Sequence, residues 1–264
     1  MKKYDLEQIR NYWEAQVKKH KQSPGASWSD TMVIEMEINA ILEYLVDGDL
    51  VLDAGCANGY STIRFAIKRN INILGIDYIP EMIVQAHENL KQCKKEITGT
   101  IAFETGNVMS IAKNANFYNK VIIKRVIASL GDYDNQLYGI RECSRVLKPG
   151  GLLLLSDATL LGWEKLNAFR REWQLPEISM PEFNNYLDQE KLLEDLSPEL
   201  ELCESKNFAS TYYVGTRILK PLLIRALDLD IDASVPNMEW NRWFSLLPSW
   251  GDYGPQKLFV LKKK

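Results

Sequence analysis

The residues with the clearest chemical potential surround a glycine-containing turn after the first apolar run of the chain. The turn lies in the segment Val51-Leu52-Asp53-Ala54-Gly55-Cys56-Ala57-Asn58-Gly59-Tyr60. Gly55 and Gly59 have no Cβ to obstruct a ligand, and the backbone amides of a helix that begins at Ser61 would point toward it. Asp77 follows Gly55 by 22 residues and ends a second apolar run, so its carboxylate can accept both hydrogen bonds from a ribose diol. The spacing predicts a site for a nucleoside-containing cofactor.

The elements that must position these residues are short apolar runs that alternate with amphipathic stretches. The expected strands are 50–52, 71–76, 100–103, 120–123 and 152–155. The expected helices are 61–68, 80–93 and 135–147, the last ended by Lys148-Pro149-Gly150-Gly151. This alternation predicts an α/β doubly wound domain with a mostly parallel sheet.

The two flanks differ in composition from this middle section. Eleven of the 15 glycines lie between Gly48 and Gly162, whereas none of the seven tryptophans lies between residues 51 and 157. Beyond Asp157, the apolar spacing predicts helices at 160–173, 212–227 and 237–247 and strands at 201–207 and 257–261. We therefore divide the chain into an N-terminal arm or lid (1–48), a cofactor-binding core (49–158) and a helical substrate cap with the last strands (159–264).

The composition disfavours several other classes of function. Lys plus Arg total 32 against 35 for Asp plus Glu, a near-balance that argues against binding to nucleic-acid backbones. The four cysteines are far apart and form no CxxC pair, and only two histidines are present, so a metal site and histidine-dependent hydrolysis are disfavoured. The N-terminal residues lack the apolar stretch of a signal peptide, and no apolar run is long enough for a bilayer. We expect a cytoplasmic protein with neither membrane nor nucleic-acid partners.

Two further motifs make the middle section resemble the class I S-adenosylmethionine-dependent methyltransferases. They are Thr105-Gly106-Asn107-Val108, after the third expected strand, and Arg145-Val146-Leu147-Lys148-Pro149-Gly150-Gly151, before the fifth. The resemblance covers about 49–158. It implies a Rossmann-like, seven-stranded fold whose last strand, 257–261, is antiparallel, with an N-terminal helical arm and a helical cap inserted after strand five. The implied cofactor is S-adenosylmethionine, with S-adenosylhomocysteine as product.

The resemblance also implies which residues hold the cofactor. The matching core positions are Asp53, Gly55, Cys56, Ala57, Gly59, Asp77, Tyr78, Met82, Asn107, Val108, Lys124 and Arg125. Tyr12 and Trp28 in the arm would cover the cofactor, or would anchor the arm by packing. Many family members have glycine at the position of Ala57, so we expect the loop to shift there while binding is retained.

Methylation of a hydroxyl is helped by a general base, and two residues are candidates for that role. Asp157 follows the fifth strand at the carboxyl edge of the sheet, where it could alternatively cap a turn or helix. His20 lies in the arm beside lysines and could alternatively be exposed to solvent. Arg125 and Arg217 could bind a phosphate or carboxylate of the acceptor, or could form structural salt bridges.

The acceptor class follows from weaker signals. Three flanking segments resemble methyltransferases of sugar and surface-polysaccharide biosynthesis, namely Ser27-Trp28-Ser29-Asp30, Lys124-Arg125-Val126-Ile127 and Tyr212-Tyr213-Val214-Gly215-Thr216-Arg217. Tryptophans such as Trp163, Trp173 and Trp243 could form a lid that stacks on sugar rings.

We therefore expect O-methylation of a small sugar-like or phosphorylated acceptor, without a metal ion. The alternatives are an NAD-type oxidoreductase, disfavoured by the glycine spacing, and a non-catalytic cofactor-binding accessory subunit. The oligomeric state stays open.

Overall fold

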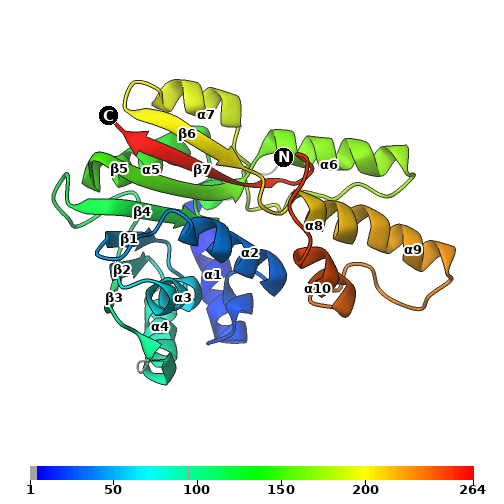
Figure 1. Cartoon of the computed structure of the whole chain (residues 1–264), viewed down its shortest axis with the longest axis horizontal. Helices are drawn as coiled ribbons and strands as arrows, with labels where there is room; N and C mark the ends of the chain where they lie inside the picture. The colour runs from blue at the N-terminus through cyan, green and yellow to red at the C-terminus, as the bar shows by residue number, and fades with distance from the viewer. Residues whose placement is uncertain (1–4, 94–95) are drawn as a thin grey trace.

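A seven-stranded sheet forms the centre of the computed structural model, which describes residues 5–93 and 96–264 (Figure 1). The strands are β1 (Leu50–Ala54), β2 (Asn72–Asp77), β3 (Thr100–Thr105), β4 (Tyr118–Lys124), β5 (Leu147–Ala158), β6 (Leu200–Lys206) and β7 (Gln256–Lys263). Their order across the sheet is β3-β2-β1-β4-β5-β7-β6. Strands β1 to β5 pair in parallel, whereas β7 is antiparallel to both β5 and β6. The predicted α/β doubly wound, mostly parallel fold is confirmed.

Helices surround the sheet and precede it. They are α1 (Leu6–His20), α2 (Thr31–Leu42), α3 (Tyr60–Lys68), α4 (Pro80–Cys93), α5 (Tyr133–Val146), α6 (Leu160–Glu172), α7 (Gln189–Leu196), α8 (Ser210–Val214), α9 (Lys220–Ala226) and α10 (Glu239–Ser245). In the described ranges, no helix combines the length and the apolar character needed to cross a bilayer.

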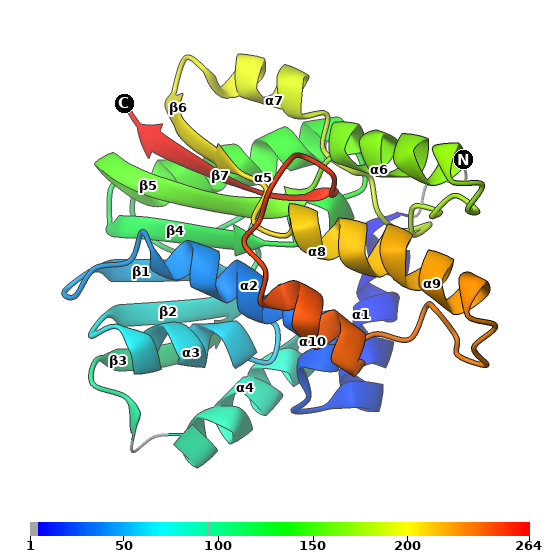
Figure 2. The ribbon, with the colours of Figure 1, turned by 45° about the vertical axis from the view of Figure 1, so that its right-hand side comes forward.

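Successive side chains of the central strands point to opposite faces of the sheet, and helices cover both faces. Val51 and Ile122 belong to the same buried cluster as α2 and α3, which Figure 2 shows in front of the strands. Leu52 and Val121 belong to a second cluster with α5 and α7. Because the sheet is covered on both sides, a ligand can reach the strands only at their ends.

The carboxyl ends of β1, β2 and β4 meet at one edge of the sheet, and backbone hydrogen bonds fix the turns that follow them. The amides of Gly55 and Cys56 both donate to the Ile76 carbonyl, at 2.8 and 2.9 Å. The amide of Arg125 donates to the Ser156 carbonyl at 2.8 Å. These bonds tie the turn after β1 to β2 and the turn after β4 to β5, so the residues of both turns have fixed positions.

Two elements differ from the sequence prediction. The helix expected at 212–227 consists of α8, a π-helical turn at 215–219 and α9. The turn lies where the ring of Phe244 from α10 packs so closely on Gly215 that a Cβ there would be 2.2 Å from it. The expected Lys148-Pro149-Gly150-Gly151 turn is part of β5, as a bulge in which Gly150 has a φ of +74°.

Candidate functional site

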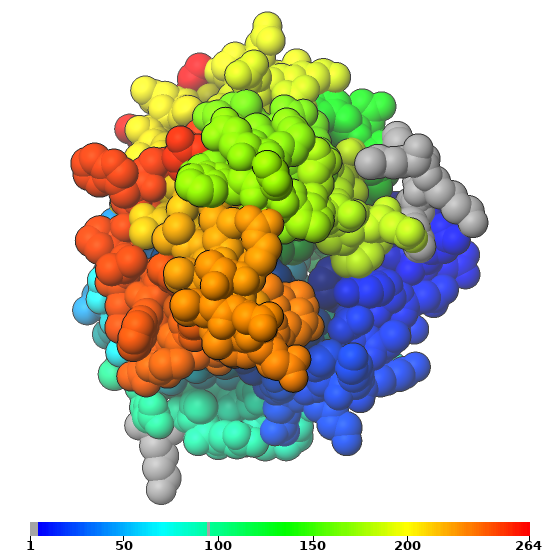
Figure 3. Space-filling model, turned by 90° about the vertical axis from the view of Figure 1, so that its right-hand side faces the viewer, coloured from blue at the N-terminus to red at the C-terminus, as the bar shows by residue number. Residues whose placement is uncertain are grey.

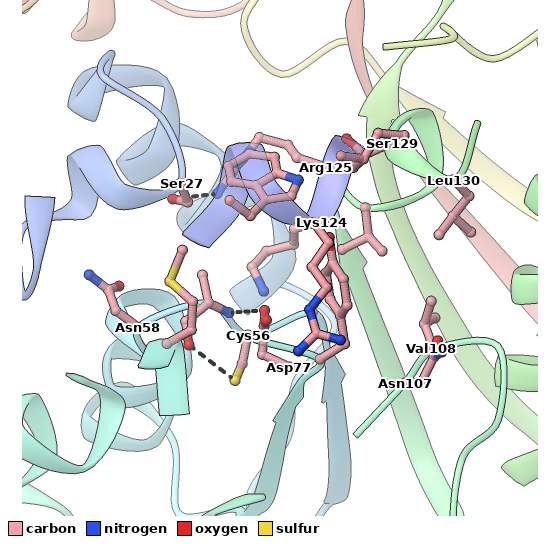
Figure 4. A pocket seen from close by; sticks show the side chains of 18 of the residues that line it. Ser27, Cys56, Asn58, Asp77, Asn107, Val108, Lys124, Arg125, Ser129 and Leu130 are labelled. Carbon is pink, nitrogen blue, oxygen red and sulfur yellow. Dashed lines mark hydrogen bonds between the residues drawn. The ribbon is translucent and has the colours of Figure 1, made fainter. Parts of the chain in front are cut away.

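A cavity of about 580 Å³ lies at the sheet edge where β1, β2 and β4 end (Figure 4). Its volume is within the roughly 300–1,000 Å³ of small-molecule sites. Ten of the residues predicted to bind the cofactor line it, namely Gly55, Cys56, Ala57, Asp77, Tyr78, Met82, Asn107, Val108, Lys124 and Arg125. The structure therefore brings together residues that are up to 70 positions apart in the sequence, from Gly55 to Arg125.

Asp77 is the lining residue with the most definite geometry. One carboxylate oxygen accepts the Ala57 amide at 2.9 Å and the other accepts the Ile79 amide at 3.0 Å. A carboxylate oxygen has two lone pairs, so each oxygen can still accept a hydrogen bond from a ligand. Burial raises the pKa of Asp77 to about 6, because the charged form loses hydration, although the two amide hydrogen bonds oppose that change.

The raised pKa of Asp77 predicts that cofactor affinity falls in mild acid. If the carboxylate must be ionised to accept both hydrogen bonds of a ribose diol, binding below pH 6 requires the loss of a proton. The affinity for S-adenosylhomocysteine should then be nearly constant above about pH 7 and fall about tenfold from pH 7 to pH 5. Calorimetric titrations at several pH values measure this change. An Asp77→Asn variant that keeps the same pH dependence would contradict the assignment.

Gly55 is required by the packing of the turns as well as by its own backbone. Its φ is +81°, and a Cβ at this position would lie 2.1 Å from Cγ2 of Val126 in the turn after β4. The missing side chain therefore makes room for Val126, where the sequence analysis expected it to make room for a ligand. Gly59 has a φ of +74° and lies outside the cavity lining, where a Cβ would be 2.6 Å from the Phe103 ring.

Ala57 has the left-handed backbone conformation that its place in the glycine turn requires, with a φ of +48°. A Cβ in this region costs about 1–2 kcal/mol. We expect Ala57→Gly to raise the melting temperature by about 2–4 °C, for a gain of about 1 kcal/mol. Thermal unfolding measures the shift. Ala15→Gly, in the exposed middle of α1, is the control and should lower the melting temperature; a similar decrease in Ala57→Gly would contradict the argument.

Asp53 and Lys124 form a buried ion pair beneath the glycine turn. Their side chains are 0% and 3% exposed, and the Lys124 ammonium contacts Oδ1 of Asp53. Oδ2 of Asp53 accepts the Thr62 hydroxyl at 2.6 Å. Asp53 therefore does not line the cavity but holds Lys124 from beneath it. Lys124 lines the cavity, and its positive charge is compensated by Asp53.

Arg125 lies where β4 ends and has an unusual environment. Its φ is +56°, and its guanidinium contacts the fully buried carboxylate of Glu37 from α2. One terminal nitrogen also lies 3.4 Å from the Ser27 hydroxyl, as Figure 4 shows, and its Nε has no hydrogen-bond partner among the described residues. The sequence analysis missed Glu37, although a carboxylate inside the apolar stretch Met36-Glu37-Ile38 was a signal that it required a buried partner.

The two predicted general bases lie outside the cavity lining. Asp157 is 2% exposed, and its carboxylate accepts the amides of Ile127, Ala128 and Ala158 at 2.8–3.1 Å. This is the capping arrangement that the sequence analysis gave as the alternative. His20 ends α1, and its ring lies beside Gly25.

The other predicted residues of the flanks also pack outside the lining. The ring of Tyr12 stacks on Phe183 with centroids 4.1 Å apart. Trp28 lies 5.5 Å from the Arg125 guanidinium, and Arg217 pairs with Asp30 at 3.1 Å. The tryptophans expected to form a lid do not line the cavity, and Trp173 and Trp243 are 51% and 68% exposed.

One wall of the cavity comes from α1, in the arm that the sequence analysis expected to cover the cofactor, but through other residues than Tyr12. Leu6, Ile9, Arg10 and Trp13 line the cavity, and Trp13 packs against the same buried cluster around Met82 as Tyr78 and Ala57 do. Leu6, Ile9 and Trp13 are spaced as residues of one helix face are, and this spacing could have identified the wall from the sequence. Tyr12 precedes Trp13 by one residue and therefore lies beside that face. Figure 3 shows the surface hollowed between this N-terminal segment, in blue, and the orange segments near α9.

Residues 45–213 match the family described as a methyltransferase domain, which is more than half of the chain. The chain belongs to this family. Among the described residues of this methyltransferase-domain protein, no group of three or more His, Cys, Asp or Glu side chains is placed to hold a metal ion.

Relatives that are named as methyltransferases share part of the sequence. The 27-O-demethylrifamycin SV methyltransferase of Amycolatopsis mediterranei is 29% identical over 43% of this chain and 40% of its own length. The O-methyltransferase resE of Aspergillus sclerotiorum is 25% identical over 66% of this chain and 69% of its own. "Probable methyltransferase ltbC" of Aspergillus luteorubrus is 28% identical over 62% and 58%. This methyltransferase-domain chain thus matches about two fifths to two thirds of the length of these relatives.

Solved structures share the fold of the whole methyltransferase-domain chain. The 4+2 cyclase SpnF is similar over 99% of this chain and 97% of its own, with a TM-score of 0.65 and 18% identity. An S-adenosylmethionine-dependent methyltransferase of Methanosarcina mazei is similar over 85% and 96%, with a TM-score of 0.56 and 18% identity. These similarities show the Rossmann-like methyltransferase fold.

The family implies S-adenosylmethionine as cofactor, and the cavity fits that molecule. Asp77 offers a buried, preorganised carboxylate to a ribose diol. Asn107 uses its side-chain oxygen to accept the Met109 amide at 2.9 Å, and its amide nitrogen makes no hydrogen bond within the described ranges, so that nitrogen is available to a base. Because Lys124 is neutralised by Asp53, no unpaired ammonium there opposes a positive sulfonium.

Proposed function

We propose that this protein is an S-adenosylmethionine-dependent methyltransferase that methylates a hydroxyl group of a small molecule. The observation that carries the proposal is the convergence of Asp77, Asn107 and the glycine turn on one cavity at the sheet edge, in a chain of the methyltransferase-domain family. The relatives whose names specify O-methylation support an oxygen acceptor. The same family match favours methyl transfer over the NAD-type oxidoreductase.

In this proposal, the residues of the chain bind and orient the reactants and exclude water. Asp77 holds the ribose, Asn107 the base, and Gly55 places the backbone of the turn next to the cofactor. The wall formed by Ile9 and Trp13 of α1 shields the reacting groups from water. When bound, S-adenosylmethionine supplies an electrophilic methyl group, so that an oxygen–carbon bond forms as a sulfur–carbon bond breaks, the sulfur keeps the bonding electron pair, and the hydroxyl proton is lost.

A sugar-like or phosphorylated acceptor is the narrower form of this proposal. Its support is the resemblance of the flanking segments to enzymes of sugar biosynthesis. Arg217 was a candidate to bind a phosphate together with Arg125, but it is paired with Asp30 and so does not add to this support. Of the tryptophans, Trp13 lines the cavity and could stack on a ring.

The test uses methyl-labelled S-adenosylmethionine and a panel of nucleotide sugars, phosphosugars and phenols. Calorimetry with S-adenosylhomocysteine is run in parallel, with the Asp77→Asn variant as control. We expect binding of S-adenosylhomocysteine and transfer of label to an oxygen of one acceptor class. Absence of cofactor binding would overturn the proposal, and binding without transfer to any acceptor would favour the non-catalytic accessory subunit.

A further inference from the structure

We propose that the acceptor is an acidic hydroxyl, a phenol or an enol, and that Arg125 binds it as its anion. This inference rests on the proposed function and names a substrate class that is an alternative to the sugar-like acceptor. It starts from two features of the cavity. Arg125, where β4 ends, has more N–H donors than partners, and of the lining carboxylates only Glu7, on the exposed start of α1, is not held by backbone amides.

The lining offers no group suited to take a proton from an alkyl hydroxyl. Its carboxylates are those of Glu7 on the exposed start of α1 and of Asp77, whose two oxygens are held by backbone amides. No histidine lines the cavity. Burial raises the pKa of the Tyr60 and Tyr78 phenols, so both stay protonated, and the Lys124 ammonium is paired with Asp53.

Arg125 has more donors than partners. A guanidinium has five N–H groups, and those of Arg125 have two partners, the Glu37 carboxylate and the Ser27 hydroxyl at 3.4 Å. Its Nε is buried with no partner among the described residues. The buried Nε is out of reach of a ligand, but the Arg125 side chain as a whole is 16% exposed and lines the cavity. A ligand oxygen would therefore approach the remaining N–H groups of its terminal nitrogens.

The charges around Arg125 leave it cationic. Glu37 from α2 contacts it, while Asp157 at the end of β5 and Tyr213 from α8 act on it electrostatically from farther away. Burial lowers the pKa of Arg125 to about 10, which still leaves it protonated at neutral pH. The Tyr213 hydroxyl is also buried and has no hydrogen-bond partner among the described residues. Burial raises the pKa of this phenol, so it stays protonated and cannot act as a base.

A protonated guanidinium that is already paired with Glu37 still offers N–H donors to an anion but no base to a hydroxyl, so it favours acceptors that ionise by themselves. A phenol has a pKa of about 10, and a nearby positive charge lowers such values by about 1–3 units. A lowering of this size makes the anion a substantial fraction at neutral pH, and its proton goes to solvent before the anion enters the cavity. An alkyl hydroxyl has a pKa close to that of bulk water, about 15.7, so the same lowering leaves it protonated.

The first measurement follows the ionisation of a chromogenic phenol and needs no turnover. The probes are 4-nitrophenol and a larger nitronaphthol, whose anions absorb visible light. We expect the protein saturated with S-adenosylhomocysteine to bind them and to lower their apparent pKa by about 1 unit. If neither probe shows a lowered pKa, the inference is overturned.

Two variants test whether Arg125 causes the change. Glu37→Gln keeps the hydrogen bonds to Ser156 and Gln256 but leaves the charge of Arg125 uncompensated, so the pKa of the probe should fall further. The double variant Glu37→Gln/Arg125→Met removes both charges together, which avoids an isolated buried carboxylate, and should abolish the change. An unaltered probe pKa in the double variant, with binding of S-adenosylhomocysteine retained, would overturn the inference.

The labelled-acceptor panel separates this inference from the proposed function. Transfer to phenols that is lost in the double variant supports both. Transfer to sugar hydroxyls at a rate independent of Arg125 supports the proposed function and overturns the phenol or enol assignment. Failure to bind S-adenosylhomocysteine overturns the proposed function. The probe titration is therefore repeated without S-adenosylhomocysteine, where the response of the probe to the charges of Glu37 and Arg125 tests the inference by itself.

Discussion

Replacing Asp77 with asparagine should weaken the binding of S-adenosylhomocysteine about 100-fold. A hydrogen bond to a charged group contributes about 1.5–3 kcal/mol, and two such bonds to a ribose diol lose their charge in this variant. The asparagine also places an NH₂ group against one of the two amides, Ala57 or Ile79, that now donate to the carboxylate. A loss of about 3 kcal/mol corresponds to the expected change in affinity. Calorimetric titration measures it.

Glu81→Gln is the matched control for this variant. Glu81 lies in the first turn of α4, is exposed and makes no contribution to the cavity lining. The substitution removes the same charge near the same edge of the sheet. It should change the affinity less than twofold, because exposed charges are screened by solvent and salt. Equal losses in both variants would show that net charge, and not the Asp77 geometry, determines binding.

Replacing Asp53 with alanine should lower the free energy of unfolding by about 3–5 kcal/mol. The variant leaves the Lys124 ammonium, 3% exposed, without its partner, and removes the acceptor of the Thr62 hydroxyl. An unpaired buried charge has a cost of this size. At about 2–4 °C per kcal/mol, the melting temperature should fall by roughly 6–20 °C.

The control removes both charges at once. In Asp53→Leu/Lys124→Met, apolar side chains replace the pair, and such replacements are often neutral or stabilising. The double variant should therefore unfold at a higher temperature than Asp53→Ala. If the double variant unfolds at as low a temperature as Asp53→Ala, the stability lost in Asp53→Ala comes from packing in the turn and not from the isolated ammonium.

The sequence predicted the order of strands and helices because each element carries its own periodic signal. The glycine turn and Asp77 were identified at the cavity because both follow apolar strands, and parallel strands bring their carboxyl ends to one edge. The helix α7 was not predicted, although Leu192, Leu193 and Leu196 have helical spacing, because its segment is short and lies between loops.

Side-chain partnerships across distant elements had no local signal. Asp157 lies near the end of β5 as Asp77 ends β2, yet only the fold determines that Asp157 faces the amides of Ile127 and Ala128 and not the cavity. The pairing of Arg125 with Glu37 joins residues 88 positions apart. The sequence does not show how α1 docks, and the docking determines which face of the helix covers the cavity. For this reason the sequence analysis predicted Tyr12 to cover the cofactor, whereas Trp13 lines the wall.

The place of β7 in the sheet has a consequence for how the protein is made. Gln256 pairs with Ala158, its register partner in β5, which the ribosome produces 98 residues earlier. At about 5–20 residues per second, the edge of β5 stays unpaired for roughly 5–20 s during translation. That edge is Leu152-Leu153-Leu154-Leu155, an apolar strand of the kind that pairs with other chains when exposed. The nascent protein is therefore expected to depend on chaperones during this interval, which begins when the cofactor-binding core has just been synthesised.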